Sequence, residues 1–181
     1  MKKTQGSVLL VSLVLLLIMT IAGLTAIRMT SLEEKMSGNY LDQQMAFRAA
    51  EVALLEAENH IATTRFDLVD FNGSCNNGYC FGGSDAIDVS TCNSGDDTPW
   101  QTTTTWSDSN LHRVATVVID GISAQAKYII EFRCYIAKED DGPIPDPTIS
   151  GDWALYFRIT ALASGGTEDA RVMLQSSYKQ L

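Results

Sequence analysis

The chain has 181 residues, of which 45% are hydrophobic and 19% are charged, and its formal net charge is -9. This length and composition suit one globular domain with a core of its own. The acidic balance argues against nucleic acid as a partner, because binding to phosphates requires a surface rich in lysine and arginine.

The first predicted element is an apolar segment near the N-terminus. Residues 7–27 contain no charged side chain, and a helix of this length spans about 30 Å, the thickness of the hydrocarbon core of a membrane. Lys2 and Lys3 precede the segment, whereas the acidic residues follow it, so the positive-inside rule places the N-terminus in the cytoplasm. We therefore predict a single transmembrane helix with the rest of the chain outside the cytoplasm.

Two processing sites are compatible with this segment. An ordinary secretory signal would use Lys2 and Lys3 as its basic region and residues 24–26 as its cleavage site, but its apolar part usually has only about 7 to 15 residues. The other site lies before the apolar segment, where the short basic leader ends at Gly6. We favour cleavage between Gly6 and Ser7, because the apolar segment is longer than in such signals and the helical pattern continues beyond it.

An amphipathic pattern follows the apolar segment, over residues 28–62. Apolar side chains recur in it at helical spacing, and they are Leu32, Met36, Tyr40, Phe47, Ala50, Leu54, Ala57 and Ile61. We therefore predict one continuous helix over residues 7–62, with its first half in the membrane and its second half packed under a globular head.

Four cysteines, Cys75, Cys80, Cys92 and Cys134, are predicted to form two disulfides, since an even number behind an export signal indicates an oxidising compartment. Three pairings are open. We favour Cys75 with Cys80, which closes a small ring around Asn77-Gly78, and Cys92 with Cys134, which ties a long loop to a strand. Zinc is the alternative, but the cysteines lack the closely spaced Cys or His partners of zinc sites.

The head is predicted to consist of a loop region and a sheet. Residues 63–110 are rich in Gly, Asn, Asp, Ser and Thr, which indicates a long loop stapled by the disulfides. Four strands are predicted within residues 111–181, and they are Leu111 to Ile119, Ala124 to Ile136, Trp153 to Ala163 and Asp169 to Tyr178. In the second strand, alternation places one face at Tyr128, Ile130, Phe132, Cys134 and Ile136. We therefore predict an α+β fold in which a four-stranded antiparallel sheet packs on the helix.

Little in the sequence indicates catalysis or metal binding. His60 and His112 are the only histidines, and the sequence contains no nucleophile elbow, phosphate loop or zinc motif. One acidic cluster lacks the spacing of a calcium loop and is interpreted as a solvated turn; it comprises Glu139, Asp140, Asp141 and Asp146. We therefore expect no catalytic residue, no metal and no cofactor, and we do not expect an enzyme.

The leader, the apolar helix and the segments that follow resemble type IV pilins and pseudopilins. In that family prepilin peptidase removes a short leader that ends in glycine, and the new N-terminus, here Ser7, is N-methylated. Residues 33–39 (EEKMSGN) and 45–54 (MAFRAAEVAL) narrow the resemblance to the PilX group of minor pilins, whose pattern is E-x-M-x-G-N followed by A-F-x-A-A-E-x-A-L. Residues 156–161 and 175–178 also resemble the C-terminal strands of that group.

The resemblance implies a type IV pilin-like α+β fold and a structural role. It implies a minor pilin that primes pilus assembly at or near the tip and supports adhesin display, surface attachment and twitching motility. The implied partners are other minor pilins, the major pilin, a tip adhesin, prepilin peptidase and the inner-membrane assembly platform. The implied location is the bacterial inner membrane, with a periplasmic head, and the assembled pilus.

The predicted organisation therefore has four parts: a leader of residues 1–6, a transmembrane segment of residues 7–27, an amphipathic helix of residues 28–62 and a head of residues 63–181. Two alternatives remain open. One is a pseudopilin of a type II secretion system, and the other is a signal-anchored periplasmic binding protein.

One residue departs from the pattern of major pilins. At Val11, the fifth position after the expected cleavage, the family usually has a glutamate that neutralises the N-terminal amine of the adjacent subunit. An unpaired ammonium group in an apolar environment is costly. A subunit without this carboxylate suits the tip of a filament, where no earlier subunit needs pairing. We expect Val11, Phe47, Ala50 and Leu54 to take part in filament packing.

Overall fold

The computed structural model of the chain describes residues 5–66, 68–81, 98–119, 121–139 and 153–181. The chain divides into two compact units, Met1–Leu41 and Asp42–Leu181. One helix, α1 (Gln5–Thr63), contributes to both units, and its continuity agrees with the helix predicted over residues 7–62. Residues 42–63 of α1 thus belong to the same compact unit as the strands.

The second unit has an α+β fold, which confirms the predicted fold class. Over the described ranges its sheet has five strands: β1 (Tyr79–Phe81), β2 (Arg113–Ile119), β3 (Ile122–Ala137), β4 (Trp153–Ser164) and β5 (Arg171–Gln180). Their order is β1-β3-β4-β5, and β2 also pairs with β3. The loop region before β2 contains short helical turns: η1 (Leu68–Asp70), η2 (Asn76–Gly78), η3 (Pro99–Gln101) and α2 (Thr103–Ser107).

The four strands predicted from the sequence are β2 to β5, and they pair antiparallel as expected. The sheet as a whole is mixed rather than antiparallel, because β1 pairs parallel to β3. The pairing of β2 ends where Arg113 lies opposite Tyr128. Beyond that point the same edge of β3 is open, and β1 occupies it with Tyr79 opposite Ile130. The prediction missed this strand because β1 is short and lies inside a segment rich in loop-forming residues.

A β-bulge between Phe132 and Cys134 changes which residues of β3 face the core. Tyr128, Ile130 and Phe132 belong to the main hydrophobic core, as the alternation predicted, but beyond the bulge Tyr135 joins them in place of Cys134. The alternation predicted for the remainder of the strand was therefore wrong, because a bulge inserts one extra residue and exchanges the two faces.

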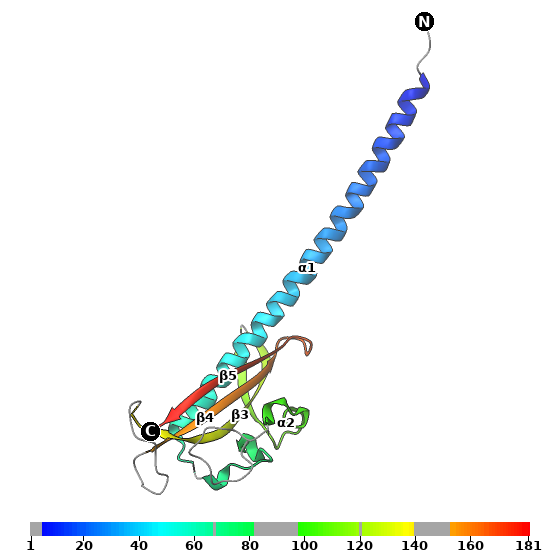
Figure 1. Cartoon of the computed structure of the whole chain (residues 1–181). Helices are drawn as coiled ribbons and strands as arrows, with labels where there is room; N and C mark the ends of the chain where they lie inside the picture. The colour runs from blue at the N-terminus through cyan, green and yellow to red at the C-terminus, as the bar shows by residue number, and fades with distance from the viewer. Residues whose placement is uncertain (1–4, 67, 82–97, 120, 140–152) are drawn as a thin grey trace. The chain divides into compact units, whose positions relative to one another are not determined.

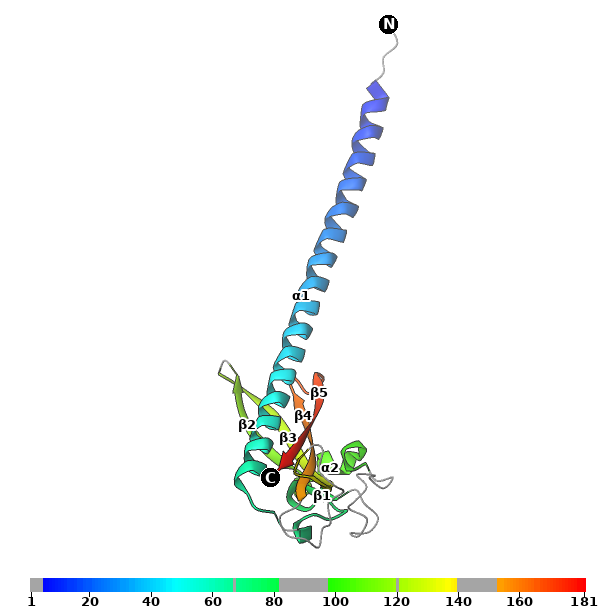
Figure 2. The ribbon, with the colours of Figure 1, turned by 60° about the vertical axis from the view of Figure 1, so that its left-hand side comes forward.

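The main core lies between α1 and one face of the sheet, and Figures 1 and 2 show the second part of the helix crossing that face. The helix buries small side chains there, and those with no exposed surface include Ala46, Ala49, Ala50, Ala53 and Ala57. The strands contribute further alanines to the same core: Ala115, Ala124, Ala126, Ala161 and Ala163. Because a methyl group takes little space, the backbones of helix and sheet can approach closely without leaving a void.

Aromatic side chains fill the part of the core where α1 ends. Phe66, which follows the helix, lies edge-on to Phe71 with ring centroids 5.3 Å apart and lies 5.7 Å from Phe157. Phe132 meets Phe157 in the same edge-to-face manner at 5.9 Å. Such contacts add to the stability that burial of the rings already provides.

Polar side chains of β5 satisfy the C-terminal end of α1. The Gln180 side-chain amide donates to the carbonyl oxygens of Ile61 and Thr64, at 2.6 and 2.8 Å. These carbonyls lack partners within the helix, so the last residue of β5 acts as a helix cap. The Ser176 hydroxyl also donates to the Glu58 carboxylate at 2.9 Å.

A second polar contact lies at Asp42, the first residue of the second unit. The Asp42 carboxylate accepts hydrogen bonds from the backbone N–H groups of Gly166 and Thr167, at 2.5 and 3.1 Å, and from the Thr167 hydroxyl. The hydroxyl, followed by the backbone donors, lowers the pKa of Asp42 below its ordinary value. The turn between β4 and β5 is thereby attached to α1.

Replacing Ala53 with leucine is expected to reduce the free energy of unfolding of the head by about 1–3 kcal/mol, because the fully buried position has no room for added methyl groups. Ala62→Leu is the matched control, since Ala62 is exposed on the same helix, and it should change stability by less than about 0.5 kcal/mol. Urea unfolding of the full chain in detergent micelles, followed by near-ultraviolet circular dichroism, measures both. If both substitutions change the free energy of unfolding equally, the buried alanines of α1 are not closely packed against the sheet.

Candidate functional site

The N-terminal part of α1 is apolar around its whole circumference. From Val8 to Ile27 every side chain is exposed and none is charged. Within the described part of the chain, one helix is long and apolar enough to cross a membrane, and its most apolar stretch lies near the N-terminus. Exposure of so much apolar surface requires a covering, either lipid or other apolar helices.

The hydroxyl groups within this apolar stretch are satisfied by the helix itself. The Ser12, Thr20 and Thr25 hydroxyls each donate to the carbonyl oxygen three residues earlier, at 2.8–2.9 Å. Each bond pairs a donor that would otherwise be costly to place in an apolar medium. These three polar residues therefore do not prevent the helix from lying in lipid or against a similar helix.

The expected cleavage site lies at the start of α1. The helix begins at Gln5, so the bond between Gly6 and Ser7 lies in its first turn, and the side chains there are outside the described part. Val11 follows in the next turn with 53% of its surface exposed. Cleavage and N-methylation at this site remain predictions.

The structure separates the four residues that we expected to pack between subunits. Ala50 is fully buried and Leu54 packs against the same core, so these two side chains contact the sheet of their own chain. Ala50 has no exposed surface in this chain, whereas Leu54 is only partly buried, so a contact of Leu54 with a neighbouring subunit stays a prediction. Val11 and Phe47 are exposed, by 53% and 40%. On the second part of α1, the exposed large apolar side chains are Phe47, Val52 and Leu55.

A disulfide joins Cys75 and Cys80, the pair that the sequence analysis favoured. Cys134 on β3 is disulfide-bonded as well. Its favoured partner, Cys92, lies outside the described residues, so the pairing of Cys92 with Cys134 stays a prediction.

The ring closed by this disulfide contains a turn that requires glycine. Gly78 has a φ of +79°, and a β-carbon added there would lie 2.8 Å from the Cγ atom of Arg113. The Asn77 backbone N–H donates to the carbonyl oxygen of Asn110 at 2.7 Å. Because a left-handed backbone and close contact coincide at Gly78, any larger residue would be strained. The turn directs β1 along the edge of β3.

Part of the described loop region, including α2, packs on the face of the sheet opposite α1. The Cys75–Cys80 disulfide and Trp106 pack with Ile129 of β3 in a second, smaller hydrophobic cluster. The Trp106 indole donates to the carbonyl oxygen of Trp100 at 2.8 Å. The loop region is therefore held by a small core of its own, which agrees with a disulfide-stapled head.

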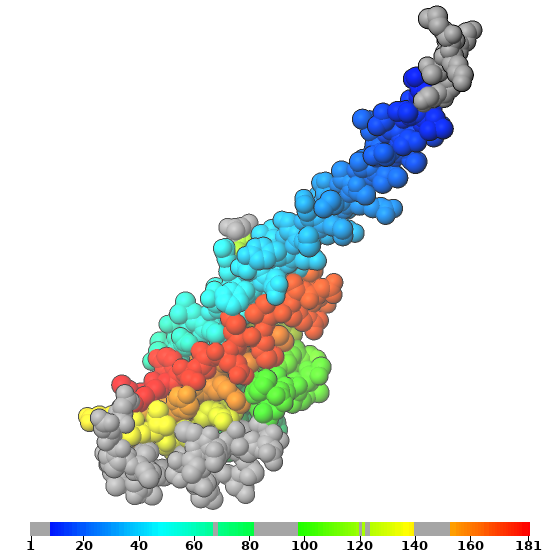
Figure 3. Space-filling model, turned by 45° about the horizontal axis from the view of Figure 1, so that its top comes forward, coloured from blue at the N-terminus to red at the C-terminus, as the bar shows by residue number. Residues whose placement is uncertain are grey.

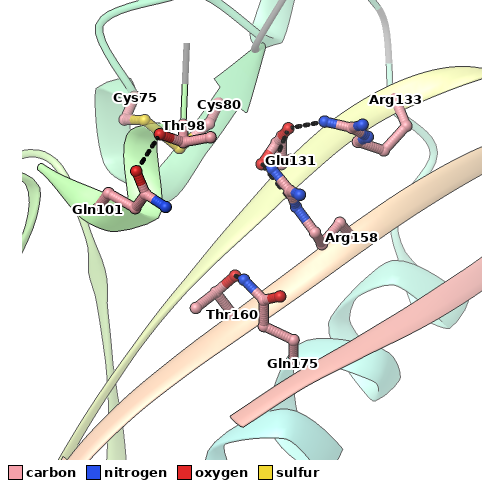
Figure 4. A network of polar contacts seen from close by, with 9 residues as sticks. All are labelled: Cys75, Cys80, Thr98, Gln101, Glu131, Arg133, Arg158, Thr160 and Gln175. Atoms are coloured by element: carbon pink, nitrogen blue, oxygen red, sulfur yellow. Dashed lines mark hydrogen bonds and ion pairs between the residues drawn. A yellow bond between two sulfur atoms is a disulfide. The ribbon is translucent and has the colours of Figure 1, made fainter. Parts of the chain in front are cut away.

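A buried carboxylate, Glu131, lies on this face of the sheet, and Figure 4 shows the side chains of Arg133 and Arg158 directed toward it. Glu131 is 1% exposed and accepts hydrogen bonds from Arg133 at 2.5 Å and from two nitrogens of Arg158 at 2.6–3.0 Å. The Arg158 guanidinium also lies 5.7 Å from the centre of the Trp100 ring. These contacts connect the sheet to the loop region above it. The sequence analysis did not single out Glu131, although a carboxylate between buried aromatic and branched residues was the available signal.

Both histidines belong to structural networks. His112 is buried, and its Nδ1–H donates to the carbonyl oxygen of Thr105 at 2.9 Å. His60 Nε2 lies 2.6 Å from the Tyr79 hydroxyl, which accepts a hydrogen bond from Arg113 at 3.2 Å. The Tyr79 hydroxyl therefore links His60 to Arg113. Burial, and then the charge of Arg113, lower the pKa of His60 below its ordinary value of 6.5, which favours the neutral form.

Among the residues that the structure describes, no group of three or more His, Cys, Asp or Glu side chains is placed to hold a metal ion. Three members of the acidic cluster, Asp140, Asp141 and Asp146, lie outside those residues. The interpretation of that cluster as a solvated turn therefore stays a prediction.

Two family models match the chain. Residues 5–55 match the model described as PilX N-terminal. Residues 76–180 match the model described as Type IV pilus assembly protein PilX C-term. No curated protein and no solved structure matches. The two matched ranges include most of α1 and all the strands of the sheet.

Replacing Arg158 with methionine is expected to lower the free energy of unfolding by roughly 2–4 kcal/mol, because it removes the two-pronged partner of a buried carboxylate. Adding Glu131→Leu to this variant removes the buried charge and should recover part of the loss. Arg65→Met, which changes an exposed arginine, is the matched control and should have little effect. Urea unfolding of the single and double variants gives the coupling energy, and additive effects would show that the two side chains do not act as a pair.

Proposed function

Because this chain belongs to the PilX family of type IV pilus assembly proteins, we propose that it is a minor pilin that primes the filament and lies at or near its tip. The observation that carries the proposal is the combination of a fully apolar, exposed helix segment from Val8 to Ile27 with a compact disulfide-bonded head. In a filament subunit the same helix lies first in lipid, before assembly, and then against the helices of other subunits.

Cleavage between Gly6 and Ser7 suits this role. Removing the leader takes away Lys2 and Lys3, the charges that would keep the N-terminus in the cytoplasm. The apolar helix stays in the mature chain, which can then leave the inner membrane and pack in a filament. In this proposal prepilin peptidase makes the cut and Ser7 is N-methylated.

The absence of a carboxylate at Val11 supports a position at the tip. Within the filament, the N-terminal ammonium group of an earlier subunit lies in an apolar environment, and leaving it unpaired by the subunit that follows is costly. Valine cannot pair with this group, whereas a subunit at the tip has no earlier subunit to pair with. Val11 and Phe47, which are both exposed, are the proposed contacts with neighbouring helices.

The head supplies specificity in this proposal. The head lies in the periplasm, where disulfides form. After the assembly platform has extracted the subunit, the head contacts other minor pilins, the major pilin and a tip adhesin. Surface attachment and twitching motility then follow from the assembled pilus. The family match favours this role over a type II secretion pseudopilin or a signal-anchored periplasmic binding protein.

Mass spectrometry of the chain from sheared pili should find an N-terminus at Ser7 that carries a methyl group. Gly6→Val should retain the leader, because a branched side chain replaces the small residue at the scissile bond, and should leave the chain in the membrane. Gly23→Val is the matched control, since nothing lies within 4 Å of a β-carbon at Gly23, and it should be processed normally. A soluble periplasmic product that starts near Ile27 would overturn the proposal.

Val11→Glu is expected to raise the number of copies per filament several-fold and to spread them along the shaft, because the new carboxylate can pair with a neighbouring ammonium group. Val14→Glu places the same charge three residues further along the helix and is the control, which should not gain shaft positions. Immunogold labelling of the head on sheared pili counts and locates the copies. If the wild-type chain and the Val11→Glu variant both label the whole shaft to the same extent, Val11 does not restrict the subunit to the tip.

A further inference from the structure

A hollow lies on the side of the sheet that carries α2, and the arguments for the proposed function did not use it. Its volume is about 260 Å³, and it lies between α2, the first half of β3, the end of β4 and the start of β5. Figure 3 shows α2, in green, next to the start of β5 on this side. The residues that define its chemistry are Trp106, Gln125, Lys127, Leu162, Glu168 and Arg171.

Two cations line this hollow, and neither forms an ion pair with any residue in the ranges that the structure describes. Lys127 is half-buried, and its ammonium group donates to the carbonyl oxygen of Trp106 at 2.7 Å. Arg171 donates through Nε to the carbonyl oxygen of Glu168 at 2.9 Å. These bonds fix both cations at the wall and leave further N–H donors on each, because an ammonium has three and a guanidinium has five.

The rest of the lining determines what kind of anion fits. Glu168 is the one carboxylate among the lining residues, so the hollow keeps an excess of positive charge on a chain whose net charge is -9. Trp106 and Leu162 add apolar surface to the lining. A ligand with a carboxylate on a short apolar stem matches both features.

We propose that this hollow binds an aspartate or glutamate side chain of a peptide segment on a partner subunit. Lys127 and Arg171 receive the carboxylate, and Trp106 and Leu162 contact the methylene groups. The volume is below the range of about 300–1,000 Å³ typical of sites for small molecules, which favours a side chain as the occupant. The partner's identity as another pilus subunit rests on the proposed function, whereas the acidic chemistry rests on the hollow.

The test uses the full chain in detergent micelles and a heptapeptide whose three central residues are Glu-Asp-Glu, with Gln-Asn-Gln in the control peptide. Binding is followed by the indole N–H signals of ¹⁵N-labelled tryptophan, and Trp106→Phe assigns the relevant signal. The acidic peptide should shift the Trp106 signal in a saturable way, and added salt should weaken the binding. The amide peptide should leave the signal unchanged.

Substitutions then separate the hollow from the overall charge. Arg171→Gln and Lys127→Gln should each weaken binding about threefold or more, and Glu168→Gln should strengthen it by a similar factor. Arg65→Gln removes an exposed charge elsewhere and should change nothing. Because the Arg171 side chain is exposed, its variant keeps the test valid even if Lys127→Gln loosens α2.

Three results would overturn the inference: no saturable binding, equal binding of the two peptides, or wild-type binding by the Arg171 and Lys127 variants. The assay does not depend on cleavage or pilus assembly. A failure here would therefore leave the tests of the proposed function unaffected, and a failure of those tests would leave the peptide result unaffected.

Discussion

The second part of α1 packs on the sheet through alanine side chains, and this close contact decides where the remaining parts of the head lie. A surface of methyl groups lets helix and strands approach without voids, so the core needs few large residues on the helix. Asp42 and Gln180 fasten the helix to β5 and its preceding turn at either end of the contact. Phe47 and Leu55 consequently point away from the core and stay available to other molecules.

The opposite face of the sheet is covered by the loop region rather than by a helix of comparable length. The Cys75–Cys80 disulfide and the two tryptophans give this cover a small apolar core, and Glu131 with its arginines lies beneath it. Burying a carboxylate is favourable only when its oxygens are fully paired. Arg158 links the two layers, because its guanidinium binds Glu131 and also lies against the ring of Trp100.

The proposed function uses two different surfaces of the chain. From Val8 to Ile27, the surface of α1 is apolar and carries no charged group, so in the proposed function it can exchange lipid for sister helices at little electrostatic cost. On the side that carries α2, Lys127, Arg171 and Trp106 line the hollow that we propose as a contact with a partner.

Local patterns in the sequence were sufficient for the long helix and for β2 to β5 to within two residues at each end, and they favoured the Cys75–Cys80 pair among three open pairings. Periodicity and turn residues act over a few positions, so they can be recognised in one chain. The parallel strand β1, the bulge after Phe132 and the buried partners of Glu131 required the folded chain. Each of these features depends on register between segments that lie far apart in sequence. The burial of Ala50 and the exposure of Phe47 also depend on the folded chain, because the sheet packs against the helix face that it can approach most closely.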